Sequence, residues 1–376
     1  MRKLKLILAV MLSAALLAGC GAEAATPGSA DATVSDDQTQ DEPTADDPQQ
    51  KEPDDGEGLM DDSVSLESLA DVNYADSDEW DKIKKNALKQ GFMLPEITML
   101  VGESLDLRSQ LRKKNKNTAW TSSDKKVVKV GKDKNTITAK KPGTAVIEGE
   151  GDNLHTFCLV TVEKKPKSTI YLTFDDGPTR YSTPKVLKIL KKNNVKATFF
   201  EIKPSKDDYD LTQKVIDEGH TLAIHGYSHS YDKIYKSDEA YHENITKLQK
   251  LFYKKFGVWC TQTRFPGGSS NTVSRHYSKG IMTRLSKKVH EWGFKYQDWN
   301  VSSGDAGGAN NADQVFKYVK SGLQKGRANV ILMHDFWGND KTINALQRVI
   351  DYGKANGYEF RAMTAATNEV HHGVNN

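Results

Sequence analysis

Apolar and polar positions divide the chain of 376 residues into stretches of different character. From residue 168 to about residue 364, short apolar runs alternate with longer stretches in which apolar residues recur every three or four positions. Short runs of this kind are typical of buried parallel strands, and the longer stretches are typical of helices that cover a sheet. We therefore expect an α/β fold here, built as a parallel sheet or an irregular (β/α) barrel. The expected strands span 169–174, 197–200, 221–224, 294–299, 329–333 and 358–363, and the expected helices span 183–192, 211–218, 244–256, 277–292, 314–324 and 343–356.

Residues 93–165 have a different pattern, in which short β-rich runs are separated by turn residues. Closely spaced short strands predict a small all-β sandwich. The segment also resembles a bacterial Ig-like domain, on WTSS at 120–123 and on the turn PGTA at 142–145. That resemblance implies a role in spacing or wall adhesion, and we find no catalytic combination of residues in this segment.

The N-terminal residues are typical of an export signal. Residues 1–19 combine a basic start with an apolar run that is shorter than the roughly 20 residues of a membrane-spanning helix, which indicates a signal peptide. The sequence LAGC that ends at Cys20 resembles the lipobox of bacterial lipoproteins. This resemblance implies that Cys20 is lipidated and anchors the protein at the extracellular face of the bacterial cell membrane. A simple secretion signal, with Cys20 incidental, is the alternative.

The residues between this signal and the β-rich segment are polar and acidic. Residues 20–68 are rich in Asp, Glu, Pro, Gln and Thr and contain few large apolar side chains, so we expect a disordered stalk. In residues 69–92, Trp80, Ile83 and Leu88 occur at helix-like spacing, which predicts a short linker helix.

The formal charge of +3 hides a strong asymmetry. Residues 21–80 carry −18, whereas residues 81–376 carry +18. A basic body suits an anionic wall polymer, and a Lys-rich surface with no specific partner is the simpler explanation. An export signal argues against a nucleic-acid partner, and we expect a monomer. Cys158 and Cys260 fall in different expected domains, so we expect two free thiols rather than a disulfide.

Charged and imidazole side chains follow two of the expected strands. Asp175 and Asp176 come directly after the strand at 169–174, and two adjacent carboxylates repel one another unless a cation lies nearby. His225 and His229 follow the strand at 221–224, and two imidazoles four residues apart can face one metal ion. Taken singly, the acidic pair is more simply a polar turn and the histidine pair is incidental. Together they form a partly filled metal shell that leaves room for water and substrate.

Two further motifs lie at strand ends. Arg264 begins the run RFPGG, in which the arginine can hold a carboxylate and the glycines expose backbone N–H groups. His334 lies in the run LMHD and has the chemistry of a general acid. A surface turn and a structural hydrogen bond are the respective alternatives.

The five motifs TFDDGP, HGYSH, RFPGG, DWNVSSGD and LMHD, in this order, resemble those of the polysaccharide deacetylase family, carbohydrate esterase family four. The resemblance covers residues 168–364 and leaves 365–376 as a tail. It implies a divalent metal held by Asp176, His225 and His229. It also implies that Asp175 is the general base and that Arg264 holds Asp175 in place.

The same resemblance implies the substrate contacts and the acid. The backbone N–H of Gly267, next to Pro266 in the substrate-binding turn, stabilises the oxyanion. His334 protonates the leaving amine, and Leu332 and Trp299 line the acetyl pocket.

One motif departs from the family pattern. Where the family often has Asp-x-x-Asp-Trp, this chain has Ser302 in place of the first Asp and Ala306 in place of the Trp. The resemblance implies that the missing Asp orients the acid histidine. Asp298 or Asp305 would have to take over that role, and the sequence does not choose between them.

These observations predict a metal-dependent N-deacetylase acting on peptidoglycan or another N-acetylglucosamine polymer. The alternatives are an O-acetyl esterase on xylan or a wall polymer, and a non-catalytic wall-binding lipoprotein. One carboxylate and two imidazoles suit zinc best, and cobalt, nickel, manganese and iron stay open. Trp259, Trp292 and Trp337 have two interpretations, stacking on sugar rings or packing in the core.

Overall fold

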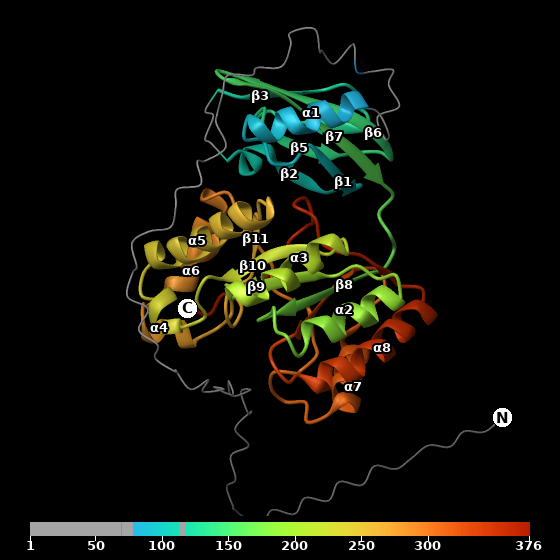
Figure 1. The fold of residues 1–376 in the computed structure, drawn as a ribbon, viewed down its shortest axis with the longest axis vertical. Helices are drawn as coiled ribbons and strands as arrows, with labels where there is room; N and C mark the ends of the chain where they lie inside the picture. Colours follow the sequence, from blue (N-terminus) through green and yellow to red (C-terminus); the bar gives the residue numbers. More distant parts are fainter. Residues whose placement is uncertain (1–68, 70–77, 113–116) are drawn as a thin grey trace, which may run out of the picture.

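The computed structural model describes residue 69, residues 78–112 and residues 117–376 (Figure 1). The expected signal peptide and stalk, and with them Cys20, lie outside the described residues. Two units follow one another along the chain, which we call the N-terminal β unit (78–163) and the barrel unit (169–376). Figure 1 shows the N-terminal β unit above the barrel unit.

The N-terminal β unit contains two small sheets. The first has the strand order β1-β7-β6-β3, with β1 parallel to β7 and the other neighbours antiparallel. The second has the order β2-β5-β4 and is antiparallel. The bounds are β1 Glu96–Leu100, β2 Ser104–Asp106, β3 Ala119–Ser122, β4 Val128–Val130, β5 Thr136–Ala139, β6 Gly143–Gly151 and β7 Leu154–Glu163, with a 3₁₀ turn at Leu107–Gln110.

Helix α1 (Asp78–Lys89) covers one face of the first sheet, where the sequence predicts a short helix. Trp80 and Ile83 are buried there, as their spacing predicts. Leu88 is 39% exposed, contrary to expectation, because Ala87 takes the inward position on the last turn. The core between the two sheets contains Trp120 and other apolar side chains of both sheets.

The barrel unit is built on one parallel sheet with the order β12-β11-β10-β9-β8-β14-β13, and β15 pairs with the start of β8. The expected α/β barrel fold is therefore confirmed. In the described part of the chain no pairing joins β12 to β13, so the barrel is open between them. The bounds are β8 Thr169–Asp175, β9 Thr198–Ile202, β10 Thr221–Gly226, β11 Gln262–Thr263, β12 Lys295–Tyr296, β13 Val301–Ser302, β14 Ala328–His334 and β15 Glu359–Phe360.

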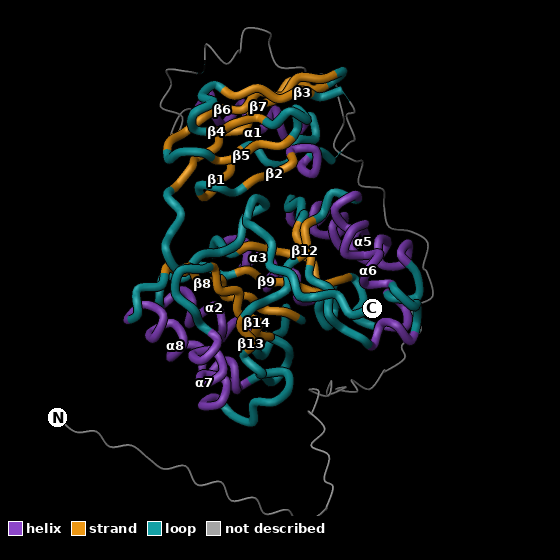
Figure 2. Tube along the Cα trace, turned by 180° about the vertical axis from the view of Figure 1, so that it is seen from behind, coloured by secondary structure: helices purple, strands orange, loops and turns teal. Residues whose placement is uncertain are grey.

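Helices surround this sheet (Figures 1 and 2). In α2, Val186, Leu187 and Leu190 form a buried stripe at helical spacing that packs on the strands, which explains why this segment is a helix. None of the described helices combines the length and apolar character needed to cross a bilayer. The bounds are α2 Thr183–Lys192, α3 Tyr209–Asp217, α4 Tyr231–Ile234, α5 Asp238–Phe256, α6 Ile281–Glu291, α7 Ala312–Gly322 and α8 Asp340–Ala355, with 3₁₀ turns at Lys206–Asp208 and Val273–His276.

The main difference from the expected elements concerns the strand at 294–299, which is reduced to the two residues of β12. Gln297 N–H still donates to the carbonyl oxygen of Thr263 in β11 (2.9 Å). Beyond Gln297 the backbone turns away from β11, and Asp298 N–H donates to the carbonyl oxygen of Val370 instead (2.8 Å). Sequence periodicity does not register such a partner, because 365–376 has neither a helical nor a strand pattern.

The N-terminal β unit contacts the barrel unit where barrel strands begin. Lys295, the first residue of β12, donates from Nζ to the carbonyl oxygen of Ser104 (3.1 Å). Gln110 Nε2 donates to Thr261 Oγ1, just ahead of β11 (3.0 Å). Because the strands are parallel, their carboxyl ends lie on the opposite side of the sheet, which is where active sites of such barrels lie.

Candidate active site

Strand β8 delivers two carboxylates to its carboxyl end. All seven residues of β8 are buried, and the strand ends at Asp175. Asp176 follows with a φ of 71°, in the left-handed region that non-glycine residues adopt rarely and Asp more readily than most. A Cβ atom at Gly177 would clash with the carboxylate of Asp335, so the turn needs glycine here.

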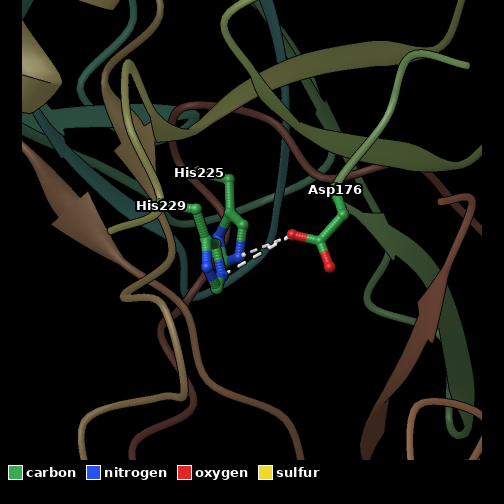
Figure 3. Close-up of side chains that lie close together, drawn as sticks. All are labelled: Asp176, His225 and His229. Carbon is green, nitrogen blue, oxygen red and sulfur yellow. Dashed lines mark ion pairs between the residues drawn. The ribbon is translucent and has the colours of Figure 1, made fainter. Parts of the chain in front are cut away.

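Strand β10 delivers two imidazoles to the same edge of the sheet. His225 lies near the end of β10 and is buried, whereas His229 is more exposed. The Nε2 atoms of His225 and His229 lie 3.4 Å and 3.7 Å from Asp176 Oδ1. Figure 3 shows both rings facing the Asp176 carboxylate. The structure therefore brings together the three residues for which the sequence predicts metal binding.

These three side chains have the donor chemistry of a divalent metal site. One ligand atom from each lies within 4.8 Å of the others. His225 Nδ1 lies 3.0 Å from the carbonyl oxygen of Arg264, which can only accept, so Nδ1 is the donor and Nε2 is the nitrogen left to face a metal. Burial and the neighbouring His225 lower the pKa of His229, which favours the neutral, metal-binding form. The set fits a metal that retains open coordination positions.

Asp175 is held by a buried arginine. Arg264 Nη1 donates to Asp175 Oδ1 at 2.7 Å, and both side chains are almost inaccessible to solvent. The other Arg264 nitrogens donate to the carbonyl oxygens of Gln297 (2.9 Å) and Asp298 (3.1 Å). Nη1 also donates to Thr173 Oγ1 (2.8 Å). Because each of these contacts fixes the guanidinium plane, Arg264 holds the carboxylate in one orientation.

His334 ends strand β14 and is paired with Asp305. Its Nδ1 atom lies 2.8 Å from Asp305 Oδ1, and its backbone N–H donates to Asp305 Oδ2 (2.8 Å). Burial by itself lowers the pKa of His334, but the charge and hydrogen bond of Asp305 outweigh burial and raise the pKa to about 9. His334 is therefore a cation at neutral pH.

The structure answers which aspartate orients the histidine. Asp305 does so, whereas the buried Asp298 accepts hydrogen bonds from the backbone N–H of Ser269 and His372 (both 2.8 Å). Asp298, which the sequence left as an equal candidate, therefore contacts neither His334 nor the metal ligands through its carboxylate in the described structure. Three further residues hold Asp305 by hydrogen bonds, and the sequence does not predict their role: Ser303, Asn339 and Thr342.

The turn that contains Gly267 is built by close approach. Gly267 and Gly268 have φ values of 77° and 76°, in the left-handed region. A Cβ atom at Gly267 would clash with the Tyr231 hydroxyl, and one at Gly268 would lie 2.8 Å from the Trp299 ring. The carbonyl oxygen of Pro266 accepts from the Tyr235 hydroxyl at 2.8 Å, which fixes the start of the turn.

Of the two side chains expected to line an acetyl pocket, Leu332 lies on a strand and Trp299 lies between β12 and β13. Leu332 lies on β14 two residues before His334, so both side chains point to the same side of the strand. Leu332 is 8% exposed, and Trp299 is half-buried over a cluster that includes Phe200.

Comparisons with known proteins agree with this geometry. The family model described as "Polysaccharide deacetylase" matches residues 162–283. A peptidoglycan-N-acetylglucosamine deacetylase of Bacillus cereus is 33% identical over 208 residues, which are 53% of this chain and 70% of that protein. A peptidoglycan-N-acetylglucosamine deacetylase of Listeria monocytogenes is 32% identical over 197 residues, or 52% of this chain and 38% of that protein.

A solved structure supports the same assignment. The catalytic domain of a peptidoglycan N-acetylglucosamine deacetylase from Eubacterium rectale is 43% identical to this chain and superposes with a TM-score of 0.53. The alignment covers 56% of this chain and 94% of that domain. The similarity to these relatives shows that the chain belongs to the polysaccharide deacetylase family, and the parallel sheet and the Asp-His-His cluster agree with it.

Proposed function

We propose that this protein removes acetyl groups from N-acetylglucosamine residues of a cell-surface glycan, with peptidoglycan as the first candidate. The convergence of Asp176, His225 and His229 beside the Asp175–Arg264 pair carries this proposal. The relatives named peptidoglycan-N-acetylglucosamine deacetylases support the choice of glycan. The basic charge of residues 81–376 suits the same anionic polymer.

Asp176, His225 and His229 would hold the divalent ion, for which we propose zinc because one carboxylate and two imidazoles suit it. When bound, such an ion polarises a carbonyl group and makes water a stronger acid. Cobalt, nickel, manganese and iron are the other candidates.

Asp175 has the position of a general base. Arg264 occupies its Oδ1 atom, and its Oδ2 atom lies 3.9 Å from His225 Nε2, on the side of the imidazole cluster. There Oδ2 can accept a proton from the attacking water while the arginine holds Oδ1 in place. The two adjacent carboxylates thus have different roles. Asp175 pairs with Arg264 and faces the water, whereas Asp176 would hold the metal.

His334 and the Gly267 turn act on the other parts of the amide. The backbone N–H of Gly267 donates to the oxygen that becomes negative when water adds to the acetyl carbon. His334, kept protonated by Asp305, gives its proton to the amine nitrogen as the carbon–nitrogen bond breaks. The products are acetate and a free amino sugar.

We further propose that Trp337 stacks on a sugar ring next to the reacting one. Trp337 is 67% exposed, which is unusual for a side chain of this size, and lies on the loop that follows His334. Its ring centroid is 5.5 Å from that of Tyr181, on the loop that follows Asp176. Trp259 and Trp292 suit this role less well, because Trp259 Nε1 donates to Ser109 in the N-terminal β unit and Trp292 stacks on His242.

The sequence supports three proposals that concern the setting of the enzyme. We infer that Cys20 is lipidated and holds the protein at the extracellular face of the membrane. The N-terminal β unit, which resembles a bacterial Ig-like domain, would serve as a spacer or wall-adhesion module. The protein would act as a monomer.

Acetate release tests the proposed function. The protein is incubated with purified N-acetylated peptidoglycan, with a strong chelator, and with the chelator followed by excess zinc. We expect release that stops on chelation and returns with the metal. Asp175→Asn should lower the rate at least about 100-fold, whereas Asp313→Asn, an exposed carboxylate on α7, should not.

The outcomes separate the candidate functions. Release that persists in chelator, or an active Asp175→Asn variant, would contradict the mechanism. Faster release from O-acetylated than from N-acetylated oligomers would identify an esterase. Glycan binding without any release would identify a wall-binding protein.

A further inference from the structure

The segment 368–376 lies along the open side of the barrel and is bound to it at many points. The described chain ends beside α6 in both views (Figures 1 and 2). There the backbone N–H of Thr283 donates to the carbonyl oxygen of Asn376, and the N–H of Gly280 donates to Asn376 Oδ1 (2.8 Å). This segment has no regular secondary structure, so side-chain and backbone hydrogen bonds fix its course.

The middle of the segment is paired with the residues that follow β12. Asp298 N–H donates to the carbonyl oxygen of Val370 (2.8 Å), and Val370 N–H donates to Oε1 of the buried Gln297 (3.0 Å). Glu369 accepts from the backbone N–H of Tyr296 (2.9 Å). The segment thus replaces the strand partner that the chain between β12 and β13 lacks.

Glu369 is fixed by histidines on both sides. His290 Nε2 lies 2.8 Å from Glu369 Oε1, and His371 Nε2 lies 3.2 Å from the same atom. The His371 ring stacks on Tyr296, with centroids 3.8 Å apart. We assign these contacts to anchoring rather than to a second metal site, because His371 Nε2 also faces the carbonyl oxygen of Tyr296 (3.2 Å) and must donate to it.

His372 contacts three residues at once. Its backbone N–H donates to the buried carboxylate of Asp298 (2.8 Å). Its Nε2 atom lies 2.7 Å from the carbonyl oxygen of Trp299, so this nitrogen carries a proton. Its Nδ1 atom lies 3.1 Å from Ser270 Oγ, and its ring contacts the Trp299 ring edge to face. A proline at position 372, which lacks the backbone N–H, would therefore leave a buried carboxylate short of one donor, which is costly.

The residues that this segment holds are those that orient the arginine of the active site. The carbonyl oxygens of Gln297 and Asp298 accept from Arg264 Nε and Nη2, and Arg264 Nη1 holds Asp175. A continuous series of direct contacts therefore runs from His372 through Asp298 and Arg264 to Asp175.

We propose that residues 368–376 form a positioning strap for the active site and that His372 is its key residue. The strap touches no reacting atom. It fixes the backbone at 297–299, which sets the orientation of Arg264 and the position of the Trp299 ring. The expected effect on kcat rests on the proposed function, whereas the expected effect on the backbone at 297–299 does not.

Variants of His372 in the full-length protein test the strap. His372→Pro removes both the backbone donor and the ring, His372→Ala removes the ring alone, and His372→Gln retains a side-chain amide that can donate to the Trp299 carbonyl. His276→Ala, an exposed histidine on the 3₁₀ turn at 273–276, is the matched control. Hydrogen–deuterium exchange of the 296–300 peptide reports on the strap, and kcat and KM report on positioning.

We expect faster exchange in the 296–300 peptide for His372→Pro and His372→Ala, with wild-type exchange in β8. We expect kcat to fall about 10- to 100-fold in both variants at a nearly constant KM, and His372→Gln to recover most of the loss. Wild-type exchange in this peptide, or wild-type kcat together with faster exchange, would overturn the proposal. If the wild-type protein releases no acetate, the proposed function fails, and the exchange measurement still decides whether the strap exists.

Discussion

Arg264 and Asp175 form an ion pair of 2.7 Å in which the arginine is fully buried and the aspartate is 2% exposed. Two carbonyl oxygens and a threonine hydroxyl accept hydrogen bonds from the other N–H groups of the guanidinium. The pair is therefore part of the protein interior as well as of the candidate site. Removing one member of such a pair leaves a charge buried without a partner.

Replacing Arg264 should therefore affect folding and activity together. We expect Arg264→Met to lower the free energy of unfolding by about 3–5 kcal/mol, measured by urea denaturation. Arg264→Lys keeps the charge but not the hydrogen bonds to both carbonyls, so it should fold better and still lose kcat. Full activity in Arg264→Lys would show that orientation by the guanidinium does not matter.

The two histidines of the proposed metal site differ in their surroundings. His225 is buried and oriented by a backbone carbonyl, whereas His229 is more exposed. We expect His225→Ala and His229→Ala each to lower zinc affinity at least about tenfold, with the larger loss for the pre-oriented His225. Calorimetric titration of metal-free protein measures both, and His276→Ala should bind like the wild type. Unchanged affinity in both variants would remove these residues from the metal site.

The His334–Asp305 pair predicts the alkaline limit of activity. His334 acts as an acid only while protonated, and Asp305 raises its pKa to about 9, so kcat should fall as pH rises through about 9. In Asp305→Asn the charge that raises the pKa is lost while burial still lowers it, so the limit should move to near or below 6.5, the ordinary histidine value. A pH–rate profile from pH 5 to 10 checks both. An alkaline limit that does not move in Asp305→Asn would assign it to another group.

Gly267 can be compared with a glycine of the same conformation elsewhere. Gly267 has a φ of 77° and faces the Tyr231 hydroxyl, whereas Gly257 has a φ of 70° and open space around it. Gly257→Ala should cost about 1–2 kcal/mol of stability and leave kcat unchanged. Gly267→Ala should cost more and lower kcat about 100-fold or more, because the backbone N–H moves away from the oxyanion. Equal effects of the two changes on kcat would contradict this role for the turn.

Trp337 should matter for long substrates only. We expect Trp337→Ala to raise KM for a glycan oligomer about 2- to 12-fold and to leave the melting temperature unchanged, because the ring is 67% exposed. Turnover of a small acetylated monosaccharide should not change, and Trp337→Phe should preserve most of the affinity. A higher KM for the monosaccharide would place the ring at the reacting sugar instead.

Much of the fold and of the candidate metal site follows from local patterns. The buried run at 169–174 predicts a strand, and parallel strands bring the residues after each of them to one edge, which is why Asp176 and His225 meet. The choice between Asp298 and Asp305 was different. Both aspartates lie between β12 and β14. Only the folded course of the backbone around Ser303 decides which of them reaches His334.

The segment 368–376 could not be predicted for another reason. Its contacts are single hydrogen bonds to residues far away in the sequence, and such contacts impose no periodicity on the segment itself. The sequence around His371 and His372 consequently gives no signal that would set them apart from ordinary surface residues. The need for glycine at position 267, where a Cβ atom would clash with Tyr231, is hidden in the same way. A distance between two turns has no sequence signature.

The N-terminal β unit meets the barrel at the starts of its strands, through contacts such as Lys295–Ser104 and Gln110–Thr261. A polymer entering from the other side thus meets no part of residues 78–163. The candidate active site therefore faces away from the N-terminal β unit. If Cys20 is lipidated as proposed, a change in the length of chain ahead of residue 78 should alter how far from the membrane the enzyme meets its substrate and leave kcat unchanged.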